Sequence, residues 1–187
     1  MSAVPTDHTG PWTLSDVLAL PQDARQRVEL VGGSLMMSPA PGIPHQRASR
    51  RLAALLEAAA DADGGALEVL EAINVVVPDG LLIPDIAVVD AEAAATAGLT
   101  LPTHDVLLVV EIASPSPRLA DRRLKPSLYA DAGVPHYWRL DLDPAPRLHL
   151  GRLRGRGYEE HTVVAGQRTR VRKPFEVWVD PGALAGR

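Results

Sequence analysis

The pattern of apolar and polar residues predicts a chain that alternates between short strands and helices. The apolar run Val106–Val110 leads into Glu111, Ile112 and Ala113, and such a run is typical of a strand buried on both faces of a sheet. A Ser-Pro-Ser-Pro segment at 114–117 ends this strand abruptly. Glu111 is therefore predicted to lie at a rim of the sheet, where a carboxylate needs a cationic partner to offset its desolvation.

Periodicity divides the rest of the chain into further elements. Helices are expected over 14–20, 45–60 and 119–132, and Pro126 interrupts the last of them. Two glycines between apolar runs predict a tight hairpin, whereas residues 90–105 give no clear pattern. The predicted strands are 27–31, 34–37, 67–71, 73–77, 83–89, 106–113, 136–141, 147–153, 158–164 and 175–179.

Composition limits the class of protein. With 187 residues and 46% hydrophobic content, we expect a flexible tail over residues 1–11 and a single domain over residues 12–187. The absence of Cys excludes disulfides and thiolate metal sites. No apolar run approaches the roughly 20 residues that span a bilayer, and no secretory signal is visible, so we expect a cytoplasmic protein with no membrane partner.

Charge is distributed unevenly along the chain. The net charge of −4 argues weakly against a nucleic-acid partner. Residues 1–117, however, contain 5 Lys and Arg against 15 Asp and Glu, whereas residues 118–187 contain 14 against 8. This division suits an acidic metal-binding centre beside a basic phosphate-binding rim, but it suits two ordinary solvated faces equally well.

Two carboxylates lie at the ends of predicted strands. Asp85 precedes the apolar run 86–89, as Glu111 follows the run 106–110. If both side chains face the same way on neighbouring strands they repel each other, and a divalent cation between them would remove the repulsion. Hard oxygen ligands in a chain without Cys favour Mg²⁺ or Mn²⁺ over zinc. In the alternative interpretation, Asp85 caps a turn and Glu111 pairs with an arginine.

Lys125 is a candidate partner for these carboxylates. It is one of 2 lysines beside 17 arginines, and it lies on the helix that follows the Glu111 strand. From there it could orient an attacking water or neutralise charge on a scissile phosphate. The alternative is a solvated helix residue. Asp121 and Tyr129 lie four residues before and after Lys125 and share its helix face.

Arginines offer further candidate contacts to phosphate. Arg47, Arg50 and Arg51 stand at the front of the predicted helix 45–60, where they oppose the helix macrodipole; this indicates either anion binding or a solvated helix end. The segments 152–156 and 168–173 are rich in Arg, and they either contact phosphates or increase solubility.

A series of ordered motifs gives the chain a family resemblance. The motifs are Glu29-Leu30-Val31-Gly32-Gly33, His45 at a helix start, Pro84-Asp85, Val109–Ser116, the four-residue spacing of Asp121, Lys125 and Tyr129, and Gly133–Trp138. Over about residues 12–145, this set resembles the Uma2 family of PD-(D/E)XK restriction-endonuclease-like proteins. The resemblance implies an α/β fold with an αβββαβ core, a central mixed β-sheet flanked by helices, and antiparallel C-terminal strands.

The resemblance also implies roles for particular residues. Asp85, Glu111 and the carbonyl of Ile112 would hold Mg²⁺ or Mn²⁺, with Glu29 assisting. The superfamily's Lys normally follows the Glu by two residues, where this chain has Ala113. Lys125 would replace it only if its helix folds back over the strand end. The predicted catalytic residues are thus Glu29, Asp85, Glu111 and Lys125, and the predicted surrounding or phosphate-contacting residues are His45, Asp121 and Tyr129.

The preferred function is that of a metal-dependent endonuclease. A water oriented by Lys125 and activated by the metal would attack a nucleic-acid phosphodiester, with DNA as the expected substrate. Three alternatives stay open: a catalytically inactive nucleic-acid- or protein-binding module on the same fold, a hydrolase of small phosphoesters, and a mainly structural homodimer.

Overall fold

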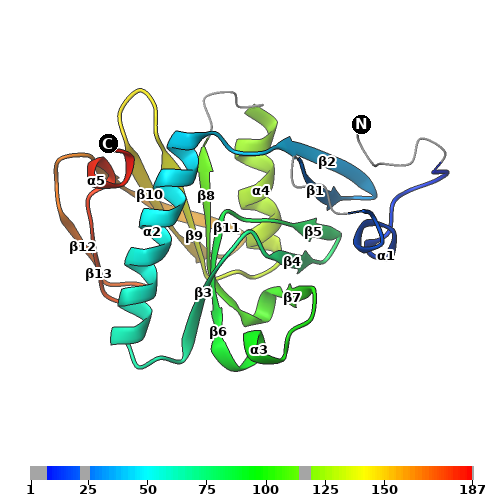
Figure 1. Cartoon of the computed structure of the whole chain (residues 1–187), viewed down its shortest axis with the longest axis horizontal. Helices are drawn as coiled ribbons and strands as arrows, with labels where there is room; N and C mark the ends of the chain where they lie inside the picture. The colour runs from blue at the N-terminus through cyan, green and yellow to red at the C-terminus, as the bar shows by residue number, and fades with distance from the viewer. Residues whose placement is uncertain (1–7, 22–25, 114–118, 187) are drawn as a thin grey trace.

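Two helices enclose a six-stranded mixed sheet (Figure 1). The computed structural model describes residues 8–21, 26–113 and 119–186, with residues 119–122 by their backbone alone. The strand order is β11-β10-β9-β8-β6-β3, and β8 and β9 run parallel while the other pairs are antiparallel. The strands are β3 (Leu67–Glu71), β6 (Ile86–Asp90), β8 (Val106–Ala113), β9 (His136–Asp141), β10 (Arg147–Arg154) and β11 (Gly157–Val164).

Each face of this sheet is covered by one long helix. The buried face of α2 (Ile43–Ala62), including Leu52, packs with Val110 and Trp138 in one core cluster. Tyr129 of α4 (Leu119–Asp131) packs with residues of the opposite sheet face in a second cluster. Since side chains alternate along a strand, Val110 of β8 faces α2, and Glu111 faces α4.

The order of elements in this layer confirms the expected αβββαβ core. It runs α2, β3, β6, β8, α4 and β9. The two strands before α2 and the segments between β3 and β8 form a second sheet of order β2-β1-β5-β4-β7. These strands are β1 (Gln26–Val31), β2 (Ser34–Pro39), β4 (Asn74–Val77), β5 (Gly80–Leu82) and β7 (Thr100–Pro102). The short elements α1 (Leu14–Leu18), α3 (Ala91–Thr96) and η1 (Thr103–Asp105) complete this part of the chain.

A glycine sets the contact between β1 and β5. A Cβ atom on Gly80 would lie 1.9 Å from the carbonyl oxygen of Leu30, so no other residue fits without moving the backbone. Leu30 pairs with Leu81 in the same ladder. This close pairing fixes β1, and with it Glu29, beside the end of the central sheet.

The C-terminal segment closes the α2 side of the molecule. It contains the antiparallel pair β12 (Thr169–Val171) and β13 (Val177–Val179), followed by α5 (Pro181–Ala185), at the left of Figure 1. Phe175 and Leu184 join the core cluster beneath α2. Arg51 donates from Nη1 to the carbonyls of Ala183 and Leu184 at 3.0 and 3.2 Å.

The predicted strands at 67–71, 106–113 and 136–141 are confirmed to the residue, and most other elements shift by a few residues. The predicted strand 83–89 is wrong at its start, since the strand begins at Ile86; Pro84 has no N–H to donate to a ladder. Strands β5, β7 and β12 are absent from the prediction, because three-residue strands carry little periodic signal. Residues 1–7 of the expected tail lie outside the described residues.

No helix in the described part of the chain combines the length and the hydropathy of a membrane-spanning segment.

Leu52 tests the packing of α2 on the sheet. Its side chain is fully buried in the α2-side core, so Leu52→Ala should lower the free energy of unfolding by about 2–5 kcal/mol. Urea denaturation followed by circular dichroism would measure this change. Ile43→Ala, at a position 71% exposed on the same helix, should stay within about 0.5 kcal/mol of wild type. Equal losses in the two variants would contradict the packing described.

Candidate active site

Lys125 lies between two carboxylates at the end of β8. Its Nζ is 2.8 Å from Oε1 of Glu29 and 3.0 Å from Oε1 of Glu111. One turn further along α4, the hydroxyl of Tyr129 donates to the same Glu111 oxygen at 3.3 Å. The helix after β8 therefore folds back over the strand end, as a lysine displaced from position 113 would require.

Glu29 reaches this cluster from the second sheet. It is 1% exposed, and its Oε1 accepts the backbone N–H of Ile83 at 2.7 Å as well as contacting Lys125. A buried carboxylate is stable only when it is paired and hydrogen-bonded. Glu29 satisfies both conditions, with one partner from the segment before β6 and one from α4.

Asp85 lies beside Glu111 but directs its oxygens to other partners. Continuing the ladder in which Ile86 pairs with Val110 places Asp85 opposite Glu111. Its Oδ2 accepts the N–H of Ile112 at 2.7 Å and lies 3.1 Å from Nε2 of His45. Its Oδ1 pairs with Nη1 of Arg27 at 2.5 Å.

His45 contacts Asp85 from the first turn of α2. The ring is buried, and its Nδ1 has no hydrogen-bond partner within the described residues. The contact with Asp85 is therefore the side-chain hydrogen bond that His45 forms within these residues. The position of His45 follows from the start of α2 at Ile43, two residues earlier than predicted, with Pro44 in the first turn.

The electrostatic environment separates the two strand-end carboxylates. Burial raises the pKa of Glu111 to about 7 despite the charge of Lys125, and the charges of Asp85 and Glu29 add to the rise. Burial also opposes ionisation of Asp85, but the hydrogen bond and charge of His45, the Ile112 amide and Arg27 lower its pKa below the ordinary value. At neutral pH, Asp85 is thus ionised, while Glu111 is near its midpoint.

Lys125 is a permanent cation in this setting. Burial disfavours its charge, but Glu111 and Glu29 outweigh burial and raise its pKa above the ordinary value. A lysine that stays protonated cannot accept a proton at neutral pH. It can donate hydrogen bonds and neutralise negative charge.

The carboxylates provide suitable chemistry for a hard cation, although the present contacts differ from a ligand shell. In the part of the chain that the structure describes, no group of three or more His, Asp or Glu residues could hold a metal ion. The oxygens of Asp85 contact Arg27, His45 and Ile112, and one oxygen of Glu111 contacts Lys125 and Tyr129. Yet the raised pKa of Glu111 reflects, after burial, neighbouring negative charge that a divalent cation would compensate. Oxygen donors alone suit Mg²⁺ or Mn²⁺.

A hollow opens next to Asp85 on the α2 side. Its volume is about 450 Å³, and its lining includes Arg27, His45, Arg47, Arg50 and Glu71. Two of the three arginines at the front of α2 therefore face a concave surface beside the site. The third, Arg51, instead binds carbonyls of α5. The anion-binding interpretation thus gains support for Arg47 and Arg50 and loses it for Arg51.

Most of the predicted site residues lie together. Lys125 joins Glu29 and Glu111, and the ladder register sets Asp85 beside Glu111. Ile112 contributes its N–H to Asp85, while a role for its carbonyl as a ligand stays a prediction. The side chain of Asp121 lies outside the described residues. The catalytic roles of all these residues stay predictions.

Sequence reasoning missed Arg27. The available signal was its position two residues before Glu29 on the same strand, which puts both side chains on one face. Tyr137 and Trp138 are 2% and 1% exposed and pack in the core.

Comparison with known proteins decides the family. The model of the Uma2 family, described as "Putative restriction endonuclease", matches residues 14–182. The chain belongs to the Uma2 family. No curated protein matches this Uma2 chain.

A solved structure confirms the restriction-endonuclease-like fold of this Uma2 protein. The crystal structure of a "putative nuclease belonging to DUF820" from Anabaena variabilis superimposes with a TM-score of 0.73. The two sequences are 16% identical, and the match covers 94% of this chain and 99% of that one. At this identity the likeness shows the shared fold alone.

Titration of Glu111 tests the electrostatics of the cluster. Because the negative charge of Glu29 raises the pKa of Glu111, Glu29→Gln should lower that pKa from about 7. Carboxyl chemical shifts followed by nuclear magnetic resonance across pH would measure it. Glu57→Gln, an exposed change on the far face of the sheet, should leave the midpoint in place. An unchanged or higher midpoint in Glu29→Gln would show that the coupling described is absent.

Proposed function

We propose that this Uma2 protein is a metal-dependent endonuclease that hydrolyses phosphodiester bonds of nucleic acid, with DNA as the substrate. The observation that carries the proposal is the placement of Lys125 between Glu29 and Glu111, next to Asp85. The carboxylates of Asp85 and Glu111, at the ends of two strands, are candidate cation ligands. The largely buried Lys125 supplies a positive charge beside the reacting phosphate. Hydrolysis of a phosphodiester needs both. Membership of a family described as putative restriction endonucleases supports the same reaction class.

Lys125 has the role of a fixed positive charge. Its raised pKa keeps it protonated, so it donates a hydrogen bond to the attacking water or to a phosphate oxygen as negative charge develops. Glu29 and Glu111 hold the ammonium in place from two different sheets. Such fixed donors act without reorganising during the reaction.

Asp85 and Glu111, with the carbonyl of Ile112, would hold Mg²⁺ or Mn²⁺, which when bound supplies Lewis-acid stabilisation of the charge on the phosphate. His45 orients Asp85 through its Nε2 contact, and Tyr129 orients Glu111 through its hydroxyl. These two residues are positioning residues in the proposal, because each acts through a carboxylate.

The hollow beside Asp85 is the proposed place for the substrate backbone. Arg27, Arg47 and Arg50 line it, so a phosphate there meets guanidinium groups within reach of the acidic cluster. A nucleic-acid strand, with its regularly spaced phosphates, suits these three arginines better than a small phosphoester does. DNA as the specific polymer, a cytoplasmic location and a homodimeric state stay predictions from the sequence.

A catalytically inactive nucleic-acid-binding module is the second candidate. One observation favours it: the Asp85 oxygens are already engaged by Arg27, His45 and the Ile112 amide. A cation that binds Asp85 must replace part of these contacts. The two candidates differ in whether that replacement occurs.

Cleavage assays with matched variants separate the two candidates. Wild type should cut plasmid and linear DNA with Mg²⁺ or Mn²⁺ and stop on addition of a chelator. Lys125→Met should slow cleavage by roughly 10²–10³-fold, because it removes a fixed charge from the transition state. Lys125→Arg, which keeps the charge, should retain more activity than Lys125→Met. Gel electrophoresis of labelled strands would give the rates.

Carboxylate variants and a remote control complete this test. Asp85→Asn and Glu111→Gln should abolish cleavage, while Glu57→Gln on the outer face of α2 should cleave as wild type. Circular dichroism would confirm that each variant is folded. Absence of cleavage of any DNA or RNA by folded wild type with either metal, together with DNA binding that Asp85→Asn leaves unchanged, would reject the endonuclease and favour the binding module.

A further inference from the structure

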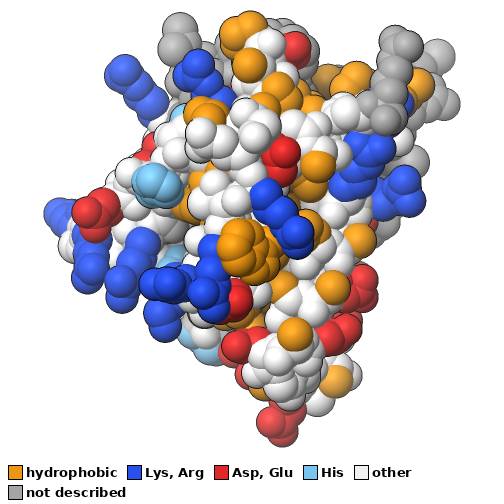
Figure 2. All heavy atoms as spheres, turned by 90° about the vertical axis from the view of Figure 1, so that its left-hand side faces the viewer, with side chains coloured by type: hydrophobic (Ala, Val, Ile, Leu, Met, Phe, Trp, Pro, Cys, Tyr) orange, Lys and Arg blue, Asp and Glu red, His pale blue; other side chains and the backbone are white. Residues whose placement is uncertain are grey.

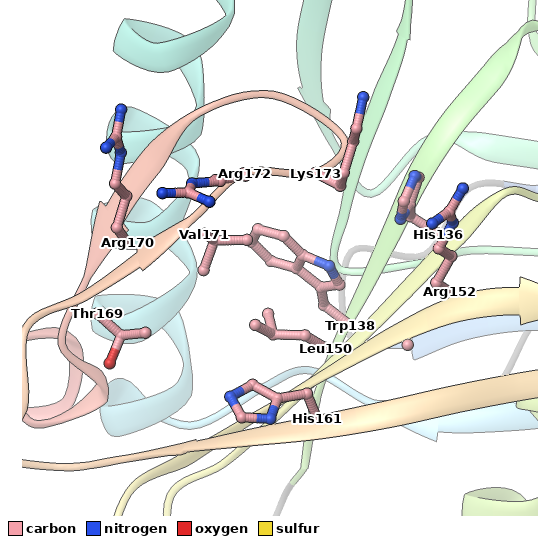
Figure 3. A pocket seen from close by; sticks show the side chains of 11 residues that line it. His136, Trp138, Leu150, Arg152, His161, Thr169, Arg170, Val171, Arg172 and Lys173 are labelled. Atoms are coloured by element: carbon pink, nitrogen blue, oxygen red, sulfur yellow. The ribbon is translucent and has the colours of Figure 1, made fainter.

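A second hollow lies between the central sheet and the C-terminal strands. Its volume is about 400 Å³. Figure 3 shows Trp138, Leu150 and Val171 close together in its middle, with basic side chains around them. The sheet contributes residues of β9, β10 and β11, and the other wall is β12 with the segment that follows it. We call this hollow the basic pocket; its polar and charged lining residues are His136, Arg152, His161, Thr169, Arg170, Arg172 and Lys173.

The positive charge of the basic pocket is largely uncompensated. No Asp or Glu among the described residues lines it. Within the same part of the chain, Arg152, Arg172 and Lys173 form no ion pair, whereas Arg170 pairs with Glu176. Burial lowers the pKa of His136, and the nearby charges of Arg152 and Lys173 lower it further.

Two acids lie near these cations. Glu176 pairs with Arg170, and the charge of Arg172 also lowers the pKa of Glu176. Glu159 lies opposite Arg152 in the β10–β11 ladder, but it forms its ion pair with Arg154 at 3.5 Å. On the other side of β10, Arg152 lies opposite His136 of β9 in the ladder. Like charges gathered around one concavity repel each other, so the arrangement favours an anion from outside the chain.

The basic pocket is separate from the candidate active site. His136 pairs with Leu108, three residues before Glu111 on β8 and so roughly 10 Å from it along the strand. Trp138 belongs to the α2-side core, whereas Glu111 and Lys125 lie on the α4 side. The sheet therefore separates the basic pocket from Glu111 and Lys125.

The surface around the basic pocket extends its charge. Figure 2 shows Lys and Arg side chains gathered on the face that Figure 1 presents at its left, where β12 and β13 lie. Arg168 lies on the same hairpin, with its guanidinium carbon 5.5 Å from the centre of the Trp178 ring. A chain of phosphates can therefore contact cations both within the pocket and along its approach.

We propose that the basic pocket is a phosphate-binding site that holds a nucleic-acid strand away from the point of cleavage. The ligand chemistry is a phosphodiester group, received by the guanidinium groups of Arg152 and Arg172 and the ammonium of Lys173. Thr169 and His161 add hydrogen-bonding groups at the rim. The choice of a nucleic-acid strand as the source of the phosphate rests on the proposed function, but the site itself does not.

Binding measurements on the full chain test this site. Fluorescence anisotropy with a labelled DNA single strand and its duplex, in the presence of a chelator, measures affinity without cleavage. Arg152→Ala and the double variant Arg172→Ala/Lys173→Ala should each weaken binding about tenfold. The slope of log affinity against log salt should fall by about 0.7–0.9 for each phosphate that the variant no longer neutralises.

Arg147 offers a matched control. It is exposed at the opposite end of the same strand as Arg152 and lies outside the pocket lining, so Arg147→Ala should bind as wild type. If Arg147→Ala weakens binding as much as Arg152→Ala, the effect is general charge loss, and the site is rejected. Wild-type affinity in both pocket variants rejects it too.

Two further measurements identify the source of the bound phosphate and distinguish failure of this site from failure of the proposed function. If dAMP displaces the DNA strand when its concentration equals that of the strand's phosphates, the pocket binds free nucleotides, and the proposal of a bound strand is rejected. Weak competition by dAMP supports the strand. A failed nuclease appears as wild-type binding without cleavage, and a failed pocket as cleavage with unaltered binding in the pocket variants.

Discussion

The ion pairs of Lys125 with Glu29 and Glu111 connect the three structural layers of this protein. Glu29 comes from β1 of the second sheet, Glu111 from β8 of the central sheet, and Lys125 from α4. A buried charge that loses its partner destabilises a fold by about 3–5 kcal/mol, and here a single ammonium serves two carboxylates. The position of α4 over the strand end is therefore both a condition for stability and the feature that assembles the candidate site.

The local part of this arrangement could be predicted from the sequence. The strand that carries Glu111 and the following helix that carries Lys125 are close along the chain, so hydrophobic pattern and spacing were sufficient. The contact of Lys125 with Glu29 joins residues far apart in sequence, and the family resemblance indicated only that both residues belong to one site. Arg27 escaped prediction because its partner, Asp85, is equally remote, and arginine is common throughout the chain.

The fold shows the same division. The αβββαβ core was expected from the resemblance, whereas the second sheet was not. This sheet is built from short strands, and its closest backbone contact depends on Gly80 having no side chain rather than on any apolar pattern.

The charge totals were also only partly informative. Arginines of the acidic front half line the hollow beside Asp85, and those of the basic back half line the basic pocket between the central sheet and β12.

The scarcity of lysine has a practical consequence for chemical labelling. Of the two side-chain amines, Lys125 is 15% exposed and held in its protonated form by two carboxylates. Lys173 is exposed at the rim of the basic pocket and forms no ion pair within the described part of the chain. Acylating reagents need an unprotonated, accessible amine. Among the lysines, a dye ester would thus attach at Lys173 and leave Lys125 in the acidic cluster unmodified.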